Sequence, residues 1–213
     1  MEYDEVYSKS PFGMSIFETT LPKSHLKDIT TITNRVLKKK ESYYGNQLSG
    51  QIADEWIISP EEMHGSKTLE FIHASLKLYF KENYPGFPKE PSFRISRLWV
   101  NEMKKYEYNP VHYHPFCDIS AALFVKVPKL DYSCIAKKGH KDGRLELISN
   151  SFGLFEKGLY TINPEIGKLV LFPGRLLHTV YPFNCDGVRR TVSFNVTWTG
   201  GSNEWQDNGF NTQ

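Results

Sequence analysis

The regular spacing of strand-like runs from Ser92 to Thr199 constrains the fold most. This segment is rich in Ile, Val, Phe, Tyr and Thr, and turn residues such as Pro128, Asn163-Pro164 and Asp186-Gly187 interrupt it. Turn signals about every 8–12 positions are typical of an all-β sandwich or barrel. We therefore predict a mainly β protein with strands near residues 93–107, 119–127, 144–149, 158–162, 168–173, 178–182 and 188–199.

The region before Ser92 has a helical pattern instead. Ser24 is suited to an N-cap, and apolar residues at spacings of three and four predict a helix over residues 24–40. A second apolar stripe predicts a helix over 66–83, while 41–60 is expected to be a loop and a strand is expected near 13–18. We divide the chain into an N-terminal helical flank (1–91) packed on the β core, the core itself (92–199) and a polar C-terminal tail (200–213).

Composition and charge exclude several classes of protein. The formal net charge of +2 gives no strong field for nucleic acid, and no apolar run approaches the ~20 residues of a membrane span. The 3 cysteines include no C-x-x-C pair, and the acidic first residues do not resemble a signal peptide. These features lead us to expect a reducing, cytoplasmic setting.

Two segments hold three of the chain's 7 histidines. His112 and His114 lie two positions apart and would share one face of a strand. His178 follows the apolar run Gly167–Pro173 and would start a strand folded back against them. Three imidazoles from such strand ends could bind one divalent metal, and Asp118 could add the carboxylate that Fe(II) favours.

The last predicted strand carries a second signal. With a period of two, one face holds Arg189, Thr191, Ser193 and Asn195, and the other is mainly apolar. A buried arginine is costly unless it is paired, and its planar fork suits a carboxylate. The polar face could thus hold a carboxylate ligand inside the barrel; alternatively, Arg189 is an exposed charge of an edge strand.

These motifs resemble those of the 2-oxoglutarate/Fe(II)-dependent oxygenase superfamily. The resemblance covers residues 92–199 and includes Leu98-Trp99-Val100-Asn101, His112-x-His114-Pro115, the Gly167–Pro173 run, His178 and the ending from Arg189 to Asn195. A bacterial and phage branch with an H-x-H-P core is the most similar. The resemblance implies a double-stranded β-helix, which is a jelly-roll shared with cupins, for the core.

The resemblance also implies site residues. His112 and His178 match the two histidines of the metal-binding triad, whereas His114 stands where a carboxylate is usual. Either His114 or Asp118 would then complete the metal site. Arg189 matches the arginine that pairs with the distal carboxylate of 2-oxoglutarate, and Thr191 matches the hydroxyl beside it. Asn101 and Asn195 are expected to line the pocket near the co-substrate.

The implied activity is hydroxylation of an unactivated C–H bond, with Fe(II) as cofactor, 2-oxoglutarate and O2 as co-substrates, and succinate and CO2 as products. Two alternatives remain open at this point. A cupin-type metalloenzyme would use the same histidines without 2-oxoglutarate, and a metal-free β-sandwich would need none of them. We expect a small-molecule or peptide substrate, no nucleic acid or membrane partner, and a helical flank that could form a homodimer surface.

Overall fold

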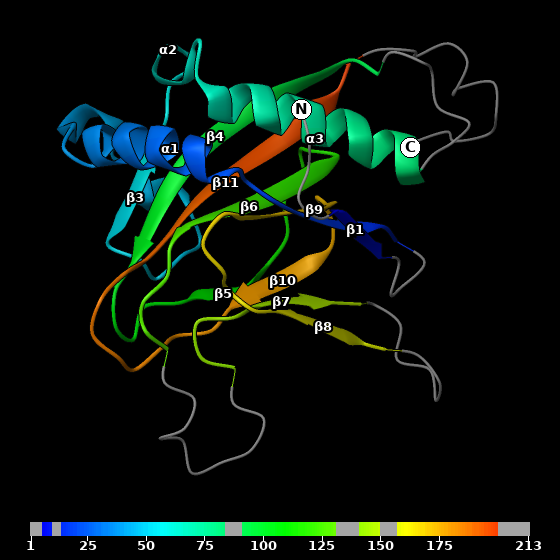
Figure 1. Cartoon of the computed structure of the whole chain (residues 1–213). Coiled ribbons are helices and arrows are strands. Elements are labelled where there is room, and N and C mark those ends of the chain that lie inside the picture. Colours follow the sequence, from blue (N-terminus) through cyan, green and yellow to red (C-terminus); the bar gives the residue numbers. More distant parts are fainter. Residues whose placement is uncertain (1–5, 10–13, 84–90, 131–140, 150–156, 200–213) are drawn as a thin grey trace.

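The computed structural model describes residues 6–9, 14–83, 91–130, 141–149 and 157–199. It contains two antiparallel β-sheets that face each other, with helices on the outer face of the larger sheet (Figure 1). The prediction of a mainly β, jelly-roll fold with an N-terminal helical flank is confirmed. No helix in the described part of the chain is both long and apolar enough to cross a membrane.

The larger sheet has seven strands in the order β1-β2-β9-β6-β11-β4-β3. Their bounds are β1 Val6–Lys9, β2 Ile16–Thr20, β3 Asp54–Ile57, β4 Phe93–Met103, β6 Ile119–Lys126, β9 Lys168–Pro173 and β11 Arg189–Trp198. The smaller sheet has four strands in the order β5-β10-β7-β8. These strands are β5 Asn109–His112, β7 Leu145–Ile148, β8 Leu159–Ile162 and β10 Leu177–Val180.

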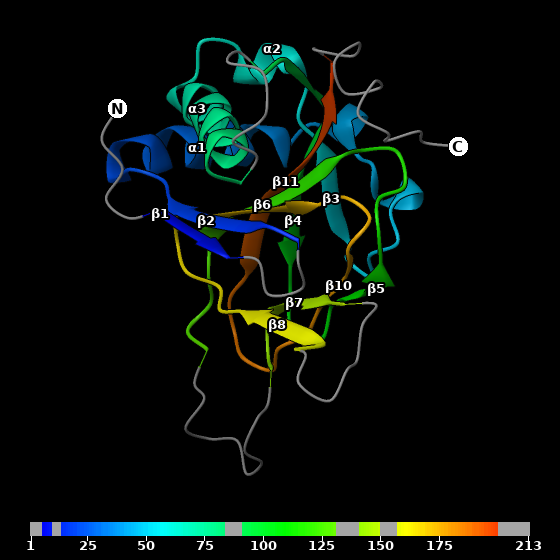
Figure 2. The ribbon, with the colours of Figure 1, turned by 90° about the vertical axis from the view of Figure 1, so that its right-hand side faces the viewer.

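Two cores follow from this layering. One lies between the larger sheet and the helices α1 (Lys23–Val36) and α3 (Lys67–Asn83), and includes Phe17, Phe71 and Phe194. The other lies between the two sheets and includes Phe124 and Phe172. Figure 2 shows the three layers from the side, with the helices above the large sheet and β5, β10, β7 and β8 below it. The short elements α2 (Pro60–Met63), η1 (Lys40–Ser42) and η2 (Gly45–Gln47) connect α1 to α3 around β3.

Most of the predicted strands are present, but three local predictions were wrong. Ser24 is not the N-cap of α1, because the helix begins at Lys23 after Pro22 and Ser24 Oγ lies 2.9 Å from His25 Nδ1. The stretch 41–60 is not all loop, since β3 pairs with β4 there. The strand expected to carry both His112 and His114 ends at His112, because β5 spans Asn109–His112, and the strand ranges given above did not include it. The proposed flank 1–91 therefore contributes β1, β2 and β3 to the large sheet, and the proposed tail 200–213 lies outside the described residues.

Candidate active site

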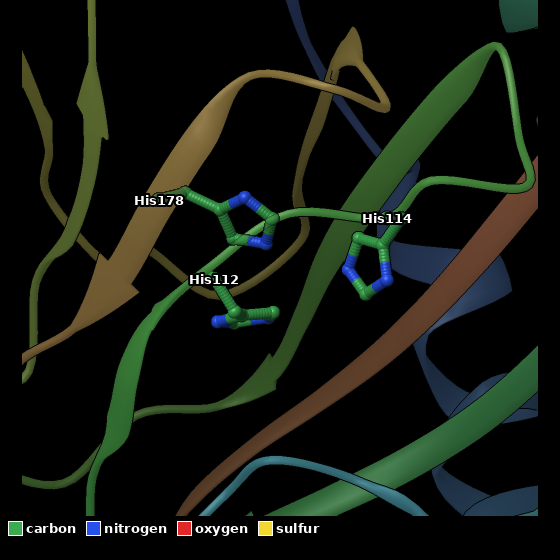
Figure 3. Close-up of side chains that lie close together, drawn as sticks. All are labelled: His112, His114 and His178. Carbon is green, nitrogen blue, oxygen red and sulfur yellow. The ribbon is translucent and has the colours of Figure 1, made fainter.

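Three histidines meet in the space between the two sheets. His112 ends β5 and pairs directly with His178 of β10, and His114 follows two residues later, beyond the strand. The ring centroids are 4.2 Å apart for His112 and His178, 5.2 Å for His112 and His114, and 5.1 Å for His114 and His178. One nitrogen from each ring lies within 4.8 Å of the others. Figure 3 shows the three rings turned toward a common centre.

Backbone carbonyls orient two of the rings. His112 Nδ1 lies 2.7 Å from the carbonyl oxygen of Pro110, and His178 Nδ1 lies 2.8 Å from that of Leu176. A carbonyl can only accept, so each Nδ1 donates and the lone pair of each ring is on Nε2. A metal-binding histidine commonly has this arrangement, with one ring nitrogen held by an acceptor and the other free to bind.

Close packing of two turns sets the position of His114. Its backbone N–H donates to the carbonyl of Gly174 (2.8 Å), and the N–H of Gly174 donates to the carbonyl of Asp118 (2.9 Å). A Cβ atom on Gly174 would lie 2.5 Å from both the carbonyl oxygen and the Sγ of Cys117. Glycine at position 174 thus allows the turn after β9 to approach the His114–Asp118 turn.

Burial favours the neutral form of all three imidazoles. It lowers the pKa of His112, against the effect of the Pro110 carbonyl, and lowers that of His178 well below its ordinary value. The pKa of His114 falls to about 4, first because of burial and then because a proton on it would be repelled by a protonated His112 and by Arg97. Neutral imidazoles are the form that binds metal, and such nitrogen donors suit iron, zinc and copper.

Asp118 lies apart from this group. Its Oδ2 accepts a hydrogen bond from the backbone N–H of Trp198 at 2.7 Å, and its side chain is exposed. Among the described residues, the cluster of close metal-ligand atoms contains His112, His114 and His178 and does not contain Asp118. Of the two candidates for the third position, the structure thus brings His114 to the other histidines.

Arg189 is buried in the same pocket. It lines the pocket together with the three histidines and Thr191, and only 2 % of its surface is exposed. Its guanidinium carbon lies 4.8 Å from the centre of the Phe124 ring, and Nη1 contacts Met103 Sδ at 3.6 Å. Its Nε has no hydrogen-bond partner among the described residues, and burial lowers the pKa of Arg189 to about 9. The expected alternative, an exposed arginine at a sheet edge, is excluded.

The remaining predicted pocket residues divide into two groups. Thr191 and Asn101 line the pocket, and Asn101 Nδ2 donates to Ser193 Oγ at 3.2 Å. Asn195 is not among the described residues that line it. Its Oδ1 instead accepts from Ser120 Oγ at 3.1 Å, so it touches the pocket only through Ser120.

Sequence reasoning missed one charged residue of the pocket. Glu55, on β3, is 1 % exposed and lines the pocket with Asn101 and Arg189. Burial, with a smaller contribution from the charge of Glu107, raises its pKa to about 7. The only signal in the sequence was the apolar run Trp56–Ile58 directly after it, which marks a short buried segment.

Comparison with known proteins identifies the core. Residues 97–195 match the family model described as "Putative 2OG-Fe(II) oxygenase". The central segment of this chain is thus similar to 2-oxoglutarate/Fe(II) oxygenases. The matched segment runs from β4 to β11 and includes the three histidines and Arg189, and the family agrees with the predicted Fe(II), 2-oxoglutarate and O2. No curated protein sequence matches the chain.

Solved structures share the fold of this chain. A Pseudomonas putida prolyl-4-hydroxylase is similar with a TM-score of 0.59 and 15% identity, over 87% of this chain and 93% of that one. A Trichoplax adhaerens prolyl hydroxylase in complex with a hypoxia inducible factor peptide fragment has a TM-score of 0.59 and 12% identity, over 94% and 88%. The epimerase SnoN in complex with Fe3+, alpha ketoglutarate and nogalamycin RO has a TM-score of 0.54 and 14% identity, over 92% and 87%. At these identities the likeness concerns the fold alone.

Proposed function

We propose that this protein is an Fe(II)- and 2-oxoglutarate-dependent hydroxylase that oxidises an unactivated C–H bond and releases succinate and CO2. One observation carries the proposal: a cluster of three imidazoles, one buried and two half-buried, shares a pocket with a buried arginine that has no carboxylate partner among the described residues. When bound, Fe(II), 2-oxoglutarate and O2 would supply the oxidising chemistry. The protein's own residues bind, orient and exclude water.

In this proposal His112, His114 and His178 hold the metal. Three observations support the fit: burial favours the neutral form of all three rings, one nitrogen of each lies within 4.8 Å of the others, and two rings have Nδ1 hydrogen-bonded to carbonyls so that Nε2 can bind a metal. An ion held by three protein ligands keeps further positions open for co-substrates. His114 would take the position that a carboxylate usually occupies in the superfamily, and Asp118 would have no role as a ligand.

Arg189 would hold the distal carboxylate of 2-oxoglutarate. A buried guanidinium loses its hydration, and a carboxylate that accepts two of its N–H groups restores both charge balance and hydrogen bonds. Arg189 Nε supports this role because it has no hydrogen-bond partner in the described part of the chain. The ring of Phe124 supports it as well, because it packs against the guanidinium and limits its orientations. Thr191, two residues along the same face of β11, would donate its hydroxyl to the same carboxylate.

A cupin-type metalloenzyme that does not use 2-oxoglutarate is the second candidate, since the three histidines alone would suit it. Arg189 separates the two candidates. An enzyme without an acidic co-substrate would leave this guanidinium buried with no anion, which costs several kcal/mol. The solved relatives with a named peptide or a named small molecule support a substrate of one of those two classes.

The direct test is succinate formation from 2-oxoglutarate by the purified full chain. We expect turnover that requires both Fe(II) and O2, that His178→Ala abolishes and that Arg189→Met reduces through a raised KM for 2-oxoglutarate. Asp118→Asn is the matched control and should retain both turnover and KM. Binding of Fe(II) without any binding of 2-oxoglutarate would favour the cupin-type alternative, and binding of neither would contradict both.

A further inference from the structure

Glu55 is a buried carboxylate that the proposed roles do not use. It is the second residue of β3, is 1 % exposed and faces the same pocket as the histidines and Arg189. Its Oε2 is fully buried and has no hydrogen-bond partner among the described residues. A buried acceptor left without a donor costs about 1–3 kcal/mol, and more when it is charged. This side chain is therefore suited to a ligand that donates hydrogen bonds.

A second unpaired acceptor lies beside it. Asn101 of β4 pairs directly across from Glu55, so the two side chains share a face of the sheet. Asn101 is 4 % exposed and lines the pocket, its Nδ2 donates to Ser193, and its Oδ1 is buried without a partner in the described structure. Adjacent strands thus present two acceptors to one region of the pocket.

These acceptors do not suit 2-oxoglutarate. A dicarboxylate offers no hydrogen-bond donors, and Glu55 would repel it when ionised. The proposed co-substrate residue Thr191 pairs with Asn101 on the far side of β4 from Glu55. Two strand spacings, roughly 10 Å, separate Glu55 from Thr191. The pocket therefore has an anion-binding end on β11 and an acceptor-lined end on β3.

The geometry points to a subsite for the primary substrate, in which Glu55 and Asn101 bind a cationic donor group such as an ammonium or a guanidinium. This inference rests on the proposed oxygenase function, because it assigns Arg189 to the co-substrate and the β3 end to the substrate. A cation would offset the buried charge of Glu55, and its several N–H groups would serve both acceptors. The raised pKa of Glu55 agrees with a carboxylate that has no cation beside it among the residues that the structure describes.

The probe for this subsite is n-butylammonium, with 1-butanol as its uncharged counterpart. Binding of each is measured by titration calorimetry to the anaerobic full chain loaded with Fe(II) and 2-oxoglutarate. We expect Glu55→Gln, which keeps the shape but removes the charge, to weaken n-butylammonium binding about tenfold or more. Its affinity for 1-butanol should not change. Glu165→Gln, which removes an exposed carboxylate that does not line the pocket, should bind both probes as the unmodified chain does.

A titration of the Glu55 carboxyl in the unmodified chain, followed by NMR, gives a test that depends on no variant. Added n-butylammonium should lower the pKa of Glu55. Equal binding of the amine to the Glu55→Gln variant, or a Glu55 pKa that the amine does not change, would overturn the inference. The affinity for 2-oxoglutarate is measured in the same samples and should be the same with and without Glu55→Gln. If the unmodified chain does not bind 2-oxoglutarate, the result contradicts the proposed function and not this inference.

Discussion

Arg189→Met should make the ligand-free protein more stable, although it removes the residue proposed to hold 2-oxoglutarate. Burial lowers the pKa of Arg189 from 12.5 to about 9, which corresponds to about 5 kcal/mol against the charged form. Because the pKa of this cation is lowered, the full cost applies at every pH below about 9. The contact with the Phe124 ring offsets about 2 kcal/mol of it. Methionine nearly fills the same space, so we expect the free energy of unfolding of the ligand-free variant to be about 2–3 kcal/mol higher than that of the unmodified chain.

The neighbouring Arg190 provides the matched control. It is equally buried, but it is ion-paired with Glu102 and its Nη1 donates to Thr33 Oγ1 (3.1 Å) and Asn34 Oδ1 (2.7 Å) of α1. Arg190→Met leaves Glu102 and these acceptors without their donor, so it should cost about 3–4 kcal/mol. Adjacent arginines on opposite faces of β11 should thus respond in opposite directions to the same substitution.

The assay is urea unfolding at about pH 7.5, with and without Fe(II) and 2-oxoglutarate under anaerobic conditions. A free 2-oxoglutarate concentration of about 100 times its Kd should raise the free energy of unfolding of the unmodified chain by about 2.7 kcal/mol. The free energy of unfolding of Arg189→Met should change little when 2-oxoglutarate is added. The reasoning is refuted if Arg189→Met destabilises the ligand-free protein as Arg190→Met does, or if the Arg189→Met variant gains as much from 2-oxoglutarate as the unmodified chain.

Three further predictions concern the rest of the pocket. Burial raises the pKa of Glu55 from 4.5 to about 7, so the unfolding free energy of the unmodified chain should fall by about 3 kcal/mol relative to that of Glu55→Gln as the pH rises through this range, and should fall no further above it. A difference in unfolding free energy that does not vary with pH would contradict this. Gly174→Ala places a Cβ 2.5 Å from the Cys117 carbonyl oxygen and should therefore displace His114. Calorimetric titration should then give a metal affinity about 10–100-fold weaker. An unchanged metal affinity would show that the two turns tolerate the methyl group. Thr191→Val should weaken 2-oxoglutarate binding about tenfold with metal affinity unchanged, and equal binding of 2-oxoglutarate would remove Thr191 from the co-substrate site.

The sequence predicted the polar face of β11 well, because a long regular strand obeys a period of two. Arg189 and Thr191 point into the pocket as that period requires. The pairing of β11 with β6 shifts register between Arg190 and Thr191, yet both Arg189 and Thr191 line the pocket. The pairing with β4 shifts between Asn195 and Val196, at the end of this face, where Asn195 contacts Ser120 instead of lining the pocket. Regular local geometry was thus sufficient to predict this half of the site.

Sequence patterns could not predict Glu55 or the burial of Arg190. The four-residue strand β3 alternates weakly and is a strand because β4 lies beside it, which is a tertiary effect. Arg190 carries a charge that a pattern would assign to the surface. It is buried because Glu102 of β4 and Asn34 of α1 surround it, and both are far away in the sequence.

The choice between His114 and Asp118 also depends on long-range contacts. Spacing along the chain allowed either side chain to approach His112 and His178. The backbone bond from His114 to Gly174 brings the imidazole toward the other two, while the N–H of Trp198 holds the carboxylate of Asp118 elsewhere. Both partners belong to segments that the local motif does not contain.

The central claim is that three imidazoles and a buried guanidinium serve one metal ion and one dicarboxylate in the same pocket. The most direct measurement is anomalous diffraction from anaerobic crystals soaked with Fe(II) and 2-oxoglutarate. We predict one iron peak bonded to His112, His114 and His178, with a carboxylate of 2-oxoglutarate hydrogen-bonded to Arg189. An iron bonded to Asp118 in place of His114, or a 2-oxoglutarate molecule that does not contact Arg189, would contradict it.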